Sequence, residues 1–482
     1  MNKTRTVEGM WRIYGEDKPS HFGILTFDPE SGLELNIKIP QSRKSYESDL
    51  LFFQQQDQGD PKVAKIIKGE DRNNNPVVLL ECYVKHWQLG ARLDHYRISV
   101  ELAMLDYHEA SWERAQFRAA TVHYTHLTDW MSQLLLKQYP AGKKPTKNSA
   151  SWTYEVEPPH VMTFELSNDV QVHIQRSCLP DSSTNEFHIR LSHTICFAFS
   201  ELLPAKAIYK GYVFVFLRLL SLLSGARIWV DEFDLYSRDP FEPGHTEPWH
   251  KCEVLFRNTG ISASTTLHYS QMVVNYNDIE AEFGNILKLW FEHQARLEPV
   301  IELFFVVMYN EVLTEESRFL LLAQALEVYH ARCSKFSSVQ EPQEIHERRV
   351  KDIMKSVSSE KDRSWLKIKL HSANQKTLSR RIEDILKSEF CKHEAGHLTA
   401  KIKDFSKKVR DSRNYYTHYG NSLRERGSVA TGLELRRITF ALFDLLHICL
   451  MKELGIKGAP IEGILARNSS TKWGDMDDVK SP

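Results

Sequence analysis

The pattern of apolar and polar positions changes once along the chain. Up to about residue 270, apolar residues alternate with polar ones, which is the period of a half-buried β-strand. Residues 21–39, HFGILTFDPESGLELNIKI, alternate on both sides of a Pro-Glu-Ser-Gly turn and predict a β-hairpin. From about Tyr276, apolar residues recur three and four positions apart, which is the spacing of an amphipathic helix. The pattern therefore predicts an α+β protein with a β-rich N-terminal region and an all-α C-terminal helical bundle.

The β-rich region divides into two parts. Residues 138–150, QYPAGKKPTKNSA, gather Pro, Gly, Lys and Ser and predict a boundary between them. We expect residues 1–140 to form one β-rich subdomain. We expect residues 150–272 to form a second, which includes a helix at 205–224. The alternation over many short strands favours a sandwich-like arrangement of both parts.

The helical region is expected to span residues 275–464. Thr314 followed by Glu315 and Glu316 predicts the start of one helix. The segment 334–363 is strongly charged and indicates either a solvated helix or a mobile insertion. Residues 465–482 are polar and predict a flexible tail.

Composition narrows the class of protein only slightly. The 482 residues include 62 Lys and Arg against 63 Asp and Glu, so a nucleic-acid site must come from local clustering of charge. The N-terminal residues contain no apolar stretch typical of a signal peptide. The most apolar segment, 212–225, is interrupted by Arg218 and is shorter than the roughly 20 residues of a membrane span. Seven widely spaced cysteines without a Cys-x-x-Cys pair favour reduced thiols, so we expect a cytoplasmic protein without a membrane partner.

One short stretch, RNYYTH, has the composition of a phosphate-cleaving site. Arg413 offers a permanently charged fork that suits phosphate, and His418 supplies an imidazole, the side-chain type that most often accepts or donates a proton in catalysis. The spacing alone is weak evidence, because Arg118 and His123 share it. RNYYTH differs in lying within a long helical pattern.

The helical context predicts how this stretch is arranged. Asn414 and His418 are four residues apart and share a helix face. Gly420 is placed to end the helix, which puts His418 in its last turn. Residues 401–410, which come before the motif, are rich in lysine and arginine. Two tyrosines within the motif would either stack on bases or pack in the core. The candidate RNA-binding residues are Lys403, Lys407, Lys408, Arg410, Tyr415 and Tyr416.

A second motif competes in the same region. His393, Glu394 and His397 spell His-Glu-x-x-His, which on a helix places two histidines where they could bind zinc beside a general base. Cys391 is a candidate third ligand. The surroundings are polar and no third-ligand motif follows, so a solvated or packed helix is the favoured interpretation, and we expect no metal cofactor.

Several segments together resemble a known family. The block SKKVRDSRNYYTHYG, residues 406–420, resembles the signature of the HEPN superfamily, the helical domain named for higher eukaryotes and prokaryotes nucleotide binding. Residues 314–331, TEESRFLLLAQALEVYHA, resemble the opening HEPN helix of the ApeA-like branch. Residues 21–37 and 80–88 resemble that branch's β-rich N-terminal domain.

This resemblance implies a metal-independent endoribonuclease without cofactors, used against phage by halting translation in the infected cell. It implies that Arg413 and His418 are catalytic and that Asn414 is the polar residue of the motif. RNA would be the substrate, with transfer RNA as one candidate, and the N-terminal region would sense or restrain, with a phage-encoded protein as a candidate trigger. Glu327, on the first HEPN-like helix, is expected either to orient a motif side chain or to form a structural salt bridge.

The geometry of one helix indicates that two copies are needed. Five positions at 3.6 residues per turn separate Arg413 and His418 by about 140° around the axis. One helix also supplies only one histidine. Pairing of two protomers about a two-fold axis would bring both residue types into one cleft, so we expect a homodimer. The alternatives are a non-catalytic HEPN module that binds RNA or protein and, more distantly, a zinc metalloprotease.

Overall fold

The structure is a computed structural model, which confirms the α+β class and the order of the two regions. One compact unit spans Met1–Gly284 and the other Asn285–Pro482. The helix α6 (Phe283–Tyr309) begins at the end of the first unit. The structure describes residues 4–13, 20–28, 31–40, 65–88, 93–108, 111–131, 136–140, 152–156, 160–182, 187–238, 250–256, 267–388, 391–399, 402–425, 427–458, 461–462 and 464. The tail at 465–482 and most of the segment 138–150 therefore lie outside the described residues.

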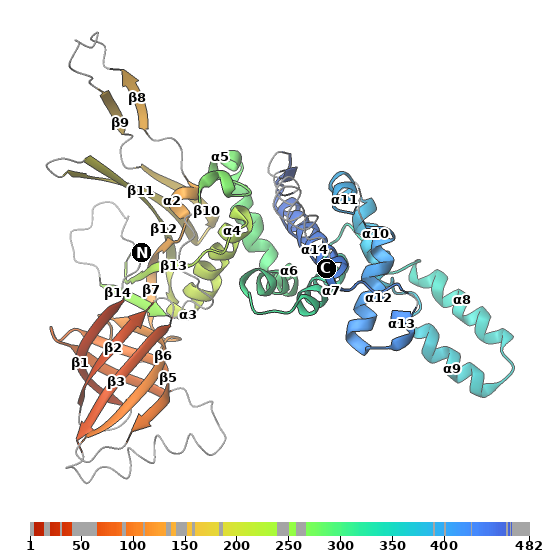
Figure 1. Cartoon of the computed structure of the whole chain (residues 1–482), viewed down its shortest axis with the longest axis horizontal. Coiled ribbons are helices and arrows are strands. Elements are labelled where there is room, and N and C mark those ends of the chain that lie inside the picture. Colours follow the sequence, from red (N-terminus) through yellow and green to blue (C-terminus); the bar gives the residue numbers. More distant parts are fainter. Residues whose placement is uncertain are drawn as a thin grey trace, which may run out of the picture. The chain divides into compact units, whose positions relative to one another are not determined.

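Six antiparallel strands close into a barrel (Figure 1). The predicted hairpin is present, because β2 pairs with β3. The barrel closes because β6 pairs with β3 on one edge and with β5 on the other. The order around the barrel is β1-β2-β3-β6-β5-β4. The strands are β1 (Arg5–Ile13), β2 (His21–Asp28), β3 (Gly32–Pro40), β4 (Lys65–Asp71), β5 (Pro76–Gln88) and β6 (Leu93–Leu105).

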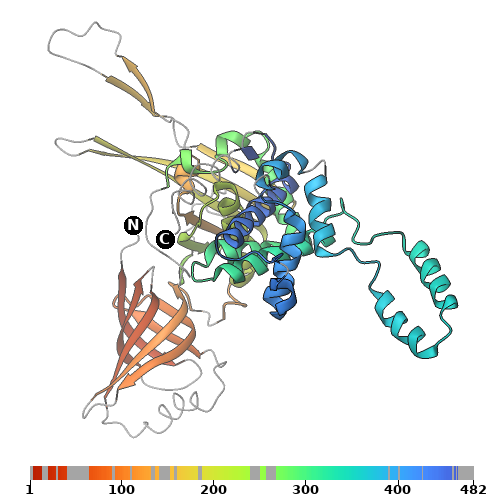
Figure 2. The same cartoon turned by 45° about the vertical axis from the view of Figure 1, so that its right-hand side comes forward.

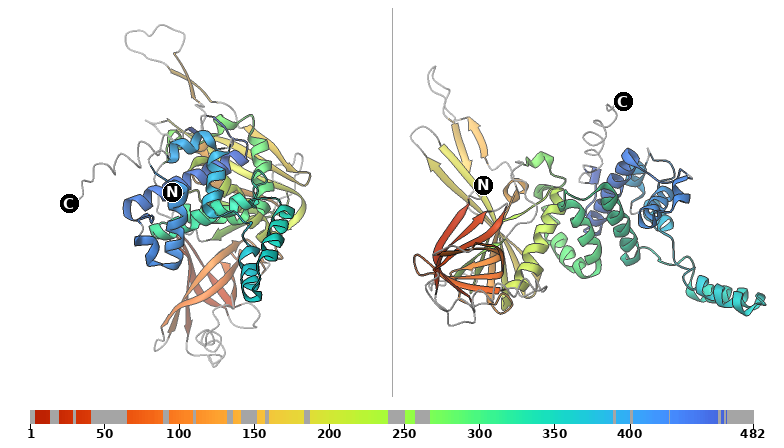
Figure 3. Two further views of the ribbon diagram at one scale, coloured as in Figure 1. Left: turned by 90° about the vertical axis from the view of Figure 1, so that its right-hand side faces the viewer. Right: turned by 60° about the horizontal axis from the view of Figure 1, so that its bottom comes forward.

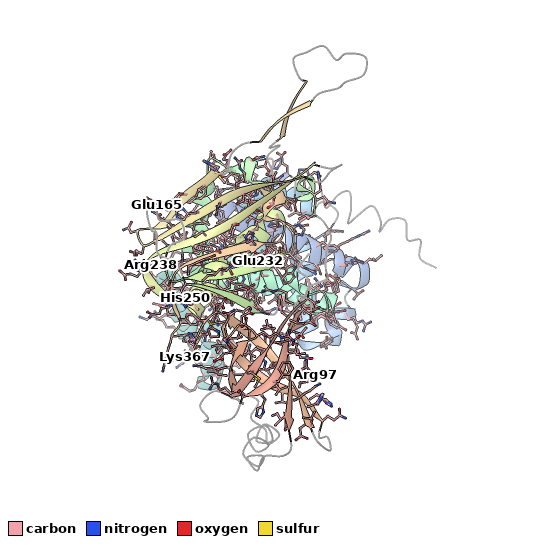
Figure 4. The ribbon with its side chains drawn as sticks, turned by 90° about the vertical axis from the view of Figure 1, so that its left-hand side faces the viewer. Arg97, Glu165, Glu232, Arg238, His250 and Lys367 are labelled. Carbon is pink, nitrogen blue, oxygen red and sulfur yellow. The ribbon has the colours of Figure 1, made fainter. Side chains whose placement is uncertain are left out.

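Alternation along the strands fills the barrel with apolar side chains. On β3, Leu33, Leu35 and Ile37 are buried in the barrel core. Outward positions carry charge: Arg97, labelled in Figure 4, places its Nε 3.4 Å from Glu34. This inside-apolar, outside-charged pattern is what the period of two in the sequence predicts.

Trp11 is the largest side chain of the barrel core and depends on two glycines. It is fully buried, and its Nε1 donates a hydrogen bond to the Gly23 carbonyl at 3.1 Å. A Cβ on Gly69 would lie 2.3 Å from the indole ring, and one on Gly23 would lie 2.9 Å from it. These glycines are required because the indole occupies the space of their missing side chains.

The same sheet continues beyond the barrel. The end of β6 leaves β3 and pairs with β14 (Lys251–Phe256), so this strand belongs both to the barrel and to the extension of the sheet. The sheet continues through β13 (Val230–Tyr236), β7 (Gln116–Tyr124), β12 (Phe187–Pro204), β11 (Val170–Ser182) and β10 (His160–Ser167). The strands β8 (Leu136–Pro140) and β9 (Trp152–Val156) form a separate pair.

The arrangement differs from the expected sandwich in a specific way. One continuous sheet curls into a barrel at one end, because β5 and β6 pair and remove the free edges of that part. β7 comes before the predicted boundary at 138–150 but pairs with β12 and β13, which follow it. Strand pairing between distant segments, which alternation does not encode, joins the two parts into one sheet.

The most apolar segment covers a face of this sheet. It comprises α3 (Ala205–Ile208), a π-helical turn (Tyr209–Val213) and α4 (Phe214–Ser224), as the predicted helix at 205–224 requires. Phe216 packs on Tyr124 and Phe197, with ring centroids 5.4 and 6.0 Å apart. Among the described residues this is the single helix with the length and hydropathy of a membrane span, and 67% of its apolar 18-residue window is buried within the fold. That burial is typical of a core helix.

The second unit is a bundle of helices. The predicted helix start is confirmed, because Ser317 donates its backbone N–H to the Thr314 hydroxyl at 3.3 Å. The remainder of α6 leads into α7 (Glu315–Arg332), which packs on α14, α12 and α10. The other helices are α8 (Gln343–Ser356), α9 (Glu360–His371), α10 (Leu378–Lys387), α11 (Lys392–Thr399), α12 (Phe405–His418), α13 (Asn421–Glu425) and α14 (Gly432–Glu453).

A buried carboxylate ties three of these helices together. Glu453 on α14 lies 2.6 Å from Arg296 Nη2 on α6 and accepts a hydrogen bond from the Tyr329 hydroxyl on α7 at 3.0 Å. Lys335 Nζ lies 2.9 Å away. Burial by itself would raise the pKa of Glu453, but these three donors lower it to about 2.

Cysteine side chains contribute no cross-links among the described residues. Six are free and buried, and Cys391 and Cys449 place their sulfurs 3.7 Å apart. The side chain of Cys178 lies outside the described set.

Candidate active site

The helix α12 carries the candidate motif, and its buried face holds it in the bundle. The buried face consists of Phe405, Ser406, Val409, Ser412, Tyr415 and Tyr416. The Ala430 N–H donates to Ser412 Oγ, and the Tyr416 hydroxyl donates to the Ala430 carbonyl, both at 2.9 Å. These two bonds attach α12 to the segment that leads into α14.

Arg413 is held by residues on two helices. Its Nη2 lies 3.3 Å from Glu327 Oε2 on α7, and its Nη1 lies 3.5 Å from the side-chain oxygen of Asn414. The Arg413 side chain is 37% exposed. The guanidinium is therefore oriented by a carboxylate and still reaches solvent, as a phosphate-binding group must.

The backbone around Glu327 is fixed in turn by a buried arginine that the sequence did not single out. Arg381 on α10 donates from Nη1 to the Glu327 carbonyl at 3.2 Å and from Nε to the Lys376 carbonyl at 3.0 Å. It is 8% exposed. The alternation of apolar and charged residues in α10 contains no signal for this role.

His418 ends α12 and lies exposed. Among the described residues its imidazole has no hydrogen-bond partner. The ring is thus open to a substrate. It lies about 140° around the helix axis from Arg413, so a single straight helix does not bring the two side chains together.

The residue that stops the helix is Tyr419, not Gly420 as the sequence predicted. Tyr419 adopts a left-handed conformation with φ of 50°, and its N–H donates to the Tyr415 carbonyl at 2.5 Å. Its ring packs on Tyr415, with centroids 5.5 Å apart. Ring packing holds a non-glycine residue in a conformation that glycine adopts more easily, a kind of backbone strain that clusters at functional sites.

Two of the four candidate cations remain available on α12 and its approach. Lys403 and Lys407 are exposed and form no ion pair with any residue whose side chain is described. Lys408 pairs with Glu434, and Arg410 Nη2 lies 2.7 Å from Asp411. Lys407 lies seven and eleven positions before Asn414 and His418, so these three side chains share one stripe of the helix.

The two tyrosines pack and do not present their faces. Tyr415 and Tyr416 are each 9% exposed, and Tyr416 meets Phe319 at a centroid distance of 6.1 Å. Of the two roles that the sequence left open for them, their burial favours packing over stacking on bases. The sequence could not decide between these roles, because an aromatic residue near a helix end has the same spacing whether it is buried or binds a base.

The His-Glu-x-x-His motif does not assemble a metal site among the described residues. His393 and His397 are exposed on α11 with ring centroids 5.5 Å apart, whereas Glu394 is buried and lies 2.7 Å from Lys452 Nζ. Cys391 contacts Cys449 in the core. The described residues contain no group of three His, Cys, Asp or Glu side chains that could hold a metal ion.

A buried histidine near the site was not expected. His330, one turn after Glu327 on α7, is fully buried, and its Nε2 lies 3.1 Å from Asp384 Oδ2. Lys376 Nζ contacts the same oxygen at 2.7 Å. Burial lowers the pKa of His330, and the ring stacks on Phe336 with centroids 4.9 Å apart. This cluster braces α7 against α10.

Fold and motif together define a HEPN-type protein with a β-rich N-terminal region. Comparison with known families agrees: residues 6–290 match the family model described as ApeA N-terminal domain 1, and residues 320–459 match the Apea-like HEPN domain. The chain belongs to the ApeA family. A HEPN domain in this family supports a nuclease or RNA-related role. Neither a curated protein nor a solved structure gives a match to this chain.

Proposed function

We propose that this protein is a metal-independent endoribonuclease whose active site is built from Arg413, Asn414 and His418. The observation that carries the proposal is the state of the motif at the end of α12. Arg413 is oriented by Glu327 yet partly exposed, and His418 is exposed without a partner among the described residues. An oriented guanidinium that reaches solvent and an open imidazole are the groups that binding a phosphate and transferring a proton require.

The chemistry needs an acid, a base and a cation. A neutral imidazole removes the proton of a ribose 2′-hydroxyl, and the oxygen attacks the adjacent phosphorus. A protonated imidazole donates a proton to the leaving 5′-oxygen, and the guanidinium of Arg413 stabilises the charge on the phosphorane. No water or metal enters the step, and the products are a 2′,3′-cyclic phosphate and a 5′-hydroxyl.

Two histidines in one site require two protomers, so we propose a homodimer with a composite cleft. We also propose that the protein acts in the cytoplasm as an anti-phage effector on cellular RNA, with transfer RNA as the first substrate to test. The N-terminal unit senses or restrains, and a phage-encoded protein is its candidate trigger.

The test compares matched variants on total RNA in EDTA. Wild type is expected to cleave, and His418→Ala and Arg413→Ala are expected to lose activity by about 100- to 10,000-fold. His397→Ala, a second exposed histidine of the same unit, and Arg12→Ala on the barrel are the controls and should cleave normally. Gel analysis of RNA fragments, with identification of cyclic phosphate ends, is the measurement.

Other outcomes distinguish the alternatives. Equal RNA binding without cleavage in all variants would make the protein a binding module. Cleavage that EDTA abolishes, or that His397→Ala removes, would contradict the metal-independent mechanism.

A further inference from the structure

The helices α8 and α9 form a hairpin that stands apart from the bundle core. They pack against each other, as Figures 2 and 3 show. Neither helix has a buried residue. The charged segment 334–363 was expected to be either a solvated helix or a mobile insertion, and the structure shows that most of it belongs to a solvated helical hairpin. We call this hairpin, residues 343–371, the arm.

The root of the arm is firmly attached. Gln340 donates its N–H to the Asn374 carbonyl at 2.8 Å, and Lys376 donates to the Ser338 carbonyl at 3.0 Å. Asn374 is 5% exposed and donates to the Glu341 carbonyl at 3.0 Å. These bonds join the segment that follows α7 to the segment that precedes α10, and these two helices carry Glu327 and Arg381.

The arm exposes large apolar side chains. Trp365 is 58% exposed and Ile368 is 75% exposed, three residues apart on α9. On α8, Ile345 and Ile353 are 48% and 37% exposed. A half-exposed tryptophan about one turn from an exposed isoleucine indicates a surface that contacts a partner.

Charge identifies the kind of partner. Residues 343–371 contain eight Lys or Arg and five Asp or Glu, a net charge of +3 on a chain whose net charge is −1. After Asp362 the helix has no acidic residue. Lys361 and Lys369 lie one turn on either side of Trp365, and neither they nor Lys367 (labelled in Figure 4) pairs with an acid among the described residues.

We propose that this hairpin is an RNA-binding arm. Trp365 stacks on an unpaired base, and Lys361 and Lys369, which lie on the same face of the helix, contact the adjacent phosphates. A helix seam for a protein partner would continue as an apolar stripe, whereas here lysines flank the tryptophan. The substrate class is RNA with an unpaired loop, and the role in positioning it rests on the proposed nuclease function.

The test measures RNA binding by the full-length protein with His418→Ala, which prevents cutting. The probes are a fluorescein-labelled RNA stem-loop and unfractionated transfer RNA, followed by fluorescence anisotropy at several salt concentrations. Trp365→Ala should weaken binding by about 5- to 100-fold without changing the salt dependence. Lys361→Ala with Lys369→Ala should make the slope of log K against log salt less steep by about 1.4, because two phosphate contacts are lost.

Exposed residues outside the arm provide matched controls. Val312→Ala, at a position that is 91% exposed, and Lys387→Ala, at one whose side chain is 73% exposed, should bind as the parent does. Circular dichroism checks folding, and the lysine variants give a second readout if Trp365→Ala is unstable.

The outcomes separate this inference from the proposed function. Parental RNA affinity in both the Trp365 and the lysine variants overturns it, whether or not the wild type cleaves RNA. Loss of self-association in Trp365→Ala with intact RNA binding also overturns it and makes the arm a protein interface. Weakened binding, with no cleavage by protein that retains His418, supports the arm and refutes the catalytic proposal.

Discussion

Glu327 and Arg413 form the contact on which the candidate site depends. They come from α7 and α12, 86 residues apart in the chain, with 3.3 Å between oxygen and nitrogen. Both side chains are about one-third exposed, so solvent screens the pair and its effect on stability is small. The effect that remains is geometric, because the carboxylate fixes the direction of the guanidinium fork.

Replacing this carboxylate with its neutral isostere should affect catalysis and not binding. In Glu327→Gln we expect kcat to fall by about 10- to 100-fold with KM for RNA nearly unchanged, because a misdirected Arg413 still attracts phosphate. Steady-state kinetics on a defined RNA measure the two constants separately. Glu298→Gln, on the exposed face of α6, is the control, and an unaltered kcat in Glu327→Gln would assign the pair a structural role only.

At the scale of elements, polar contacts decide how the helices are joined. The Glu453 cluster links α6, α7 and α14, whose apolar faces alone would allow more than one register. A carboxylate that meets three donors fixes one register among several apolar ones. The cost of burying a charge is offset only when its partners are all present.

Removing that charge should therefore lower stability in a pH-dependent way. The folded-state pKa of Glu453 is about 2, below its ordinary value of 4.5, so its contribution is complete above about pH 4.5 and disappears as pH falls towards 2. Glu453→Gln should lose about 3 kcal/mol of unfolding free energy at pH 7 and nearly nothing at pH 2. Urea denaturation at both pH values measures this. Glu360→Gln, an 88% exposed position on α9, should change stability little, and an equal loss in both variants would contradict the argument.

At the scale of the whole molecule, the active site is expected to belong to a pair of chains. One α12 offers one imidazole, directed away from its own arginine by about 140°. A two-fold axis near the end of α12 would place the arginine of each chain near the histidine of the other.

Subunit exchange tests this arrangement. Wild type that is mixed with an equal amount of His418→Ala and allowed to exchange subunits should lose about half of its cleavage activity, because random pairing places half of the wild-type subunits in dimers that lack the second imidazole. The measurement is cleavage before and after exchange, with light scattering to establish the dimer. Cleavage activity that stays the same after mixed dimers have formed would contradict a composite cleft.

Much of the fold could be predicted because local pattern encodes local structure. Period-two alternation predicts the strands of the hairpin at 21–39, and helical spacing predicts α7 with its Thr314 cap. Closure of the barrel could not be predicted. It depends on pairing between β5 and β6 through backbone hydrogen bonds, which the side-chain pattern does not encode. The same applies to Tyr419, whose strained turn depends on ring contacts with Tyr415 and Tyr416.

The sequence by itself determined the two-part α+β order, the position of the Arg413 and His418 motif at a helix end, and the family. These follow from periodicity and from residue type, which act within a few turns of chain. Only the tertiary structure decided that Glu327 meets Arg413, that Tyr415 and Tyr416 are buried, that Glu394 is paired with Lys452, and that Trp365 stands exposed on an arm. Each of these features depends on which residues from distant parts of the chain lie next to the side chain. Those neighbours are defined only when the whole unit has folded.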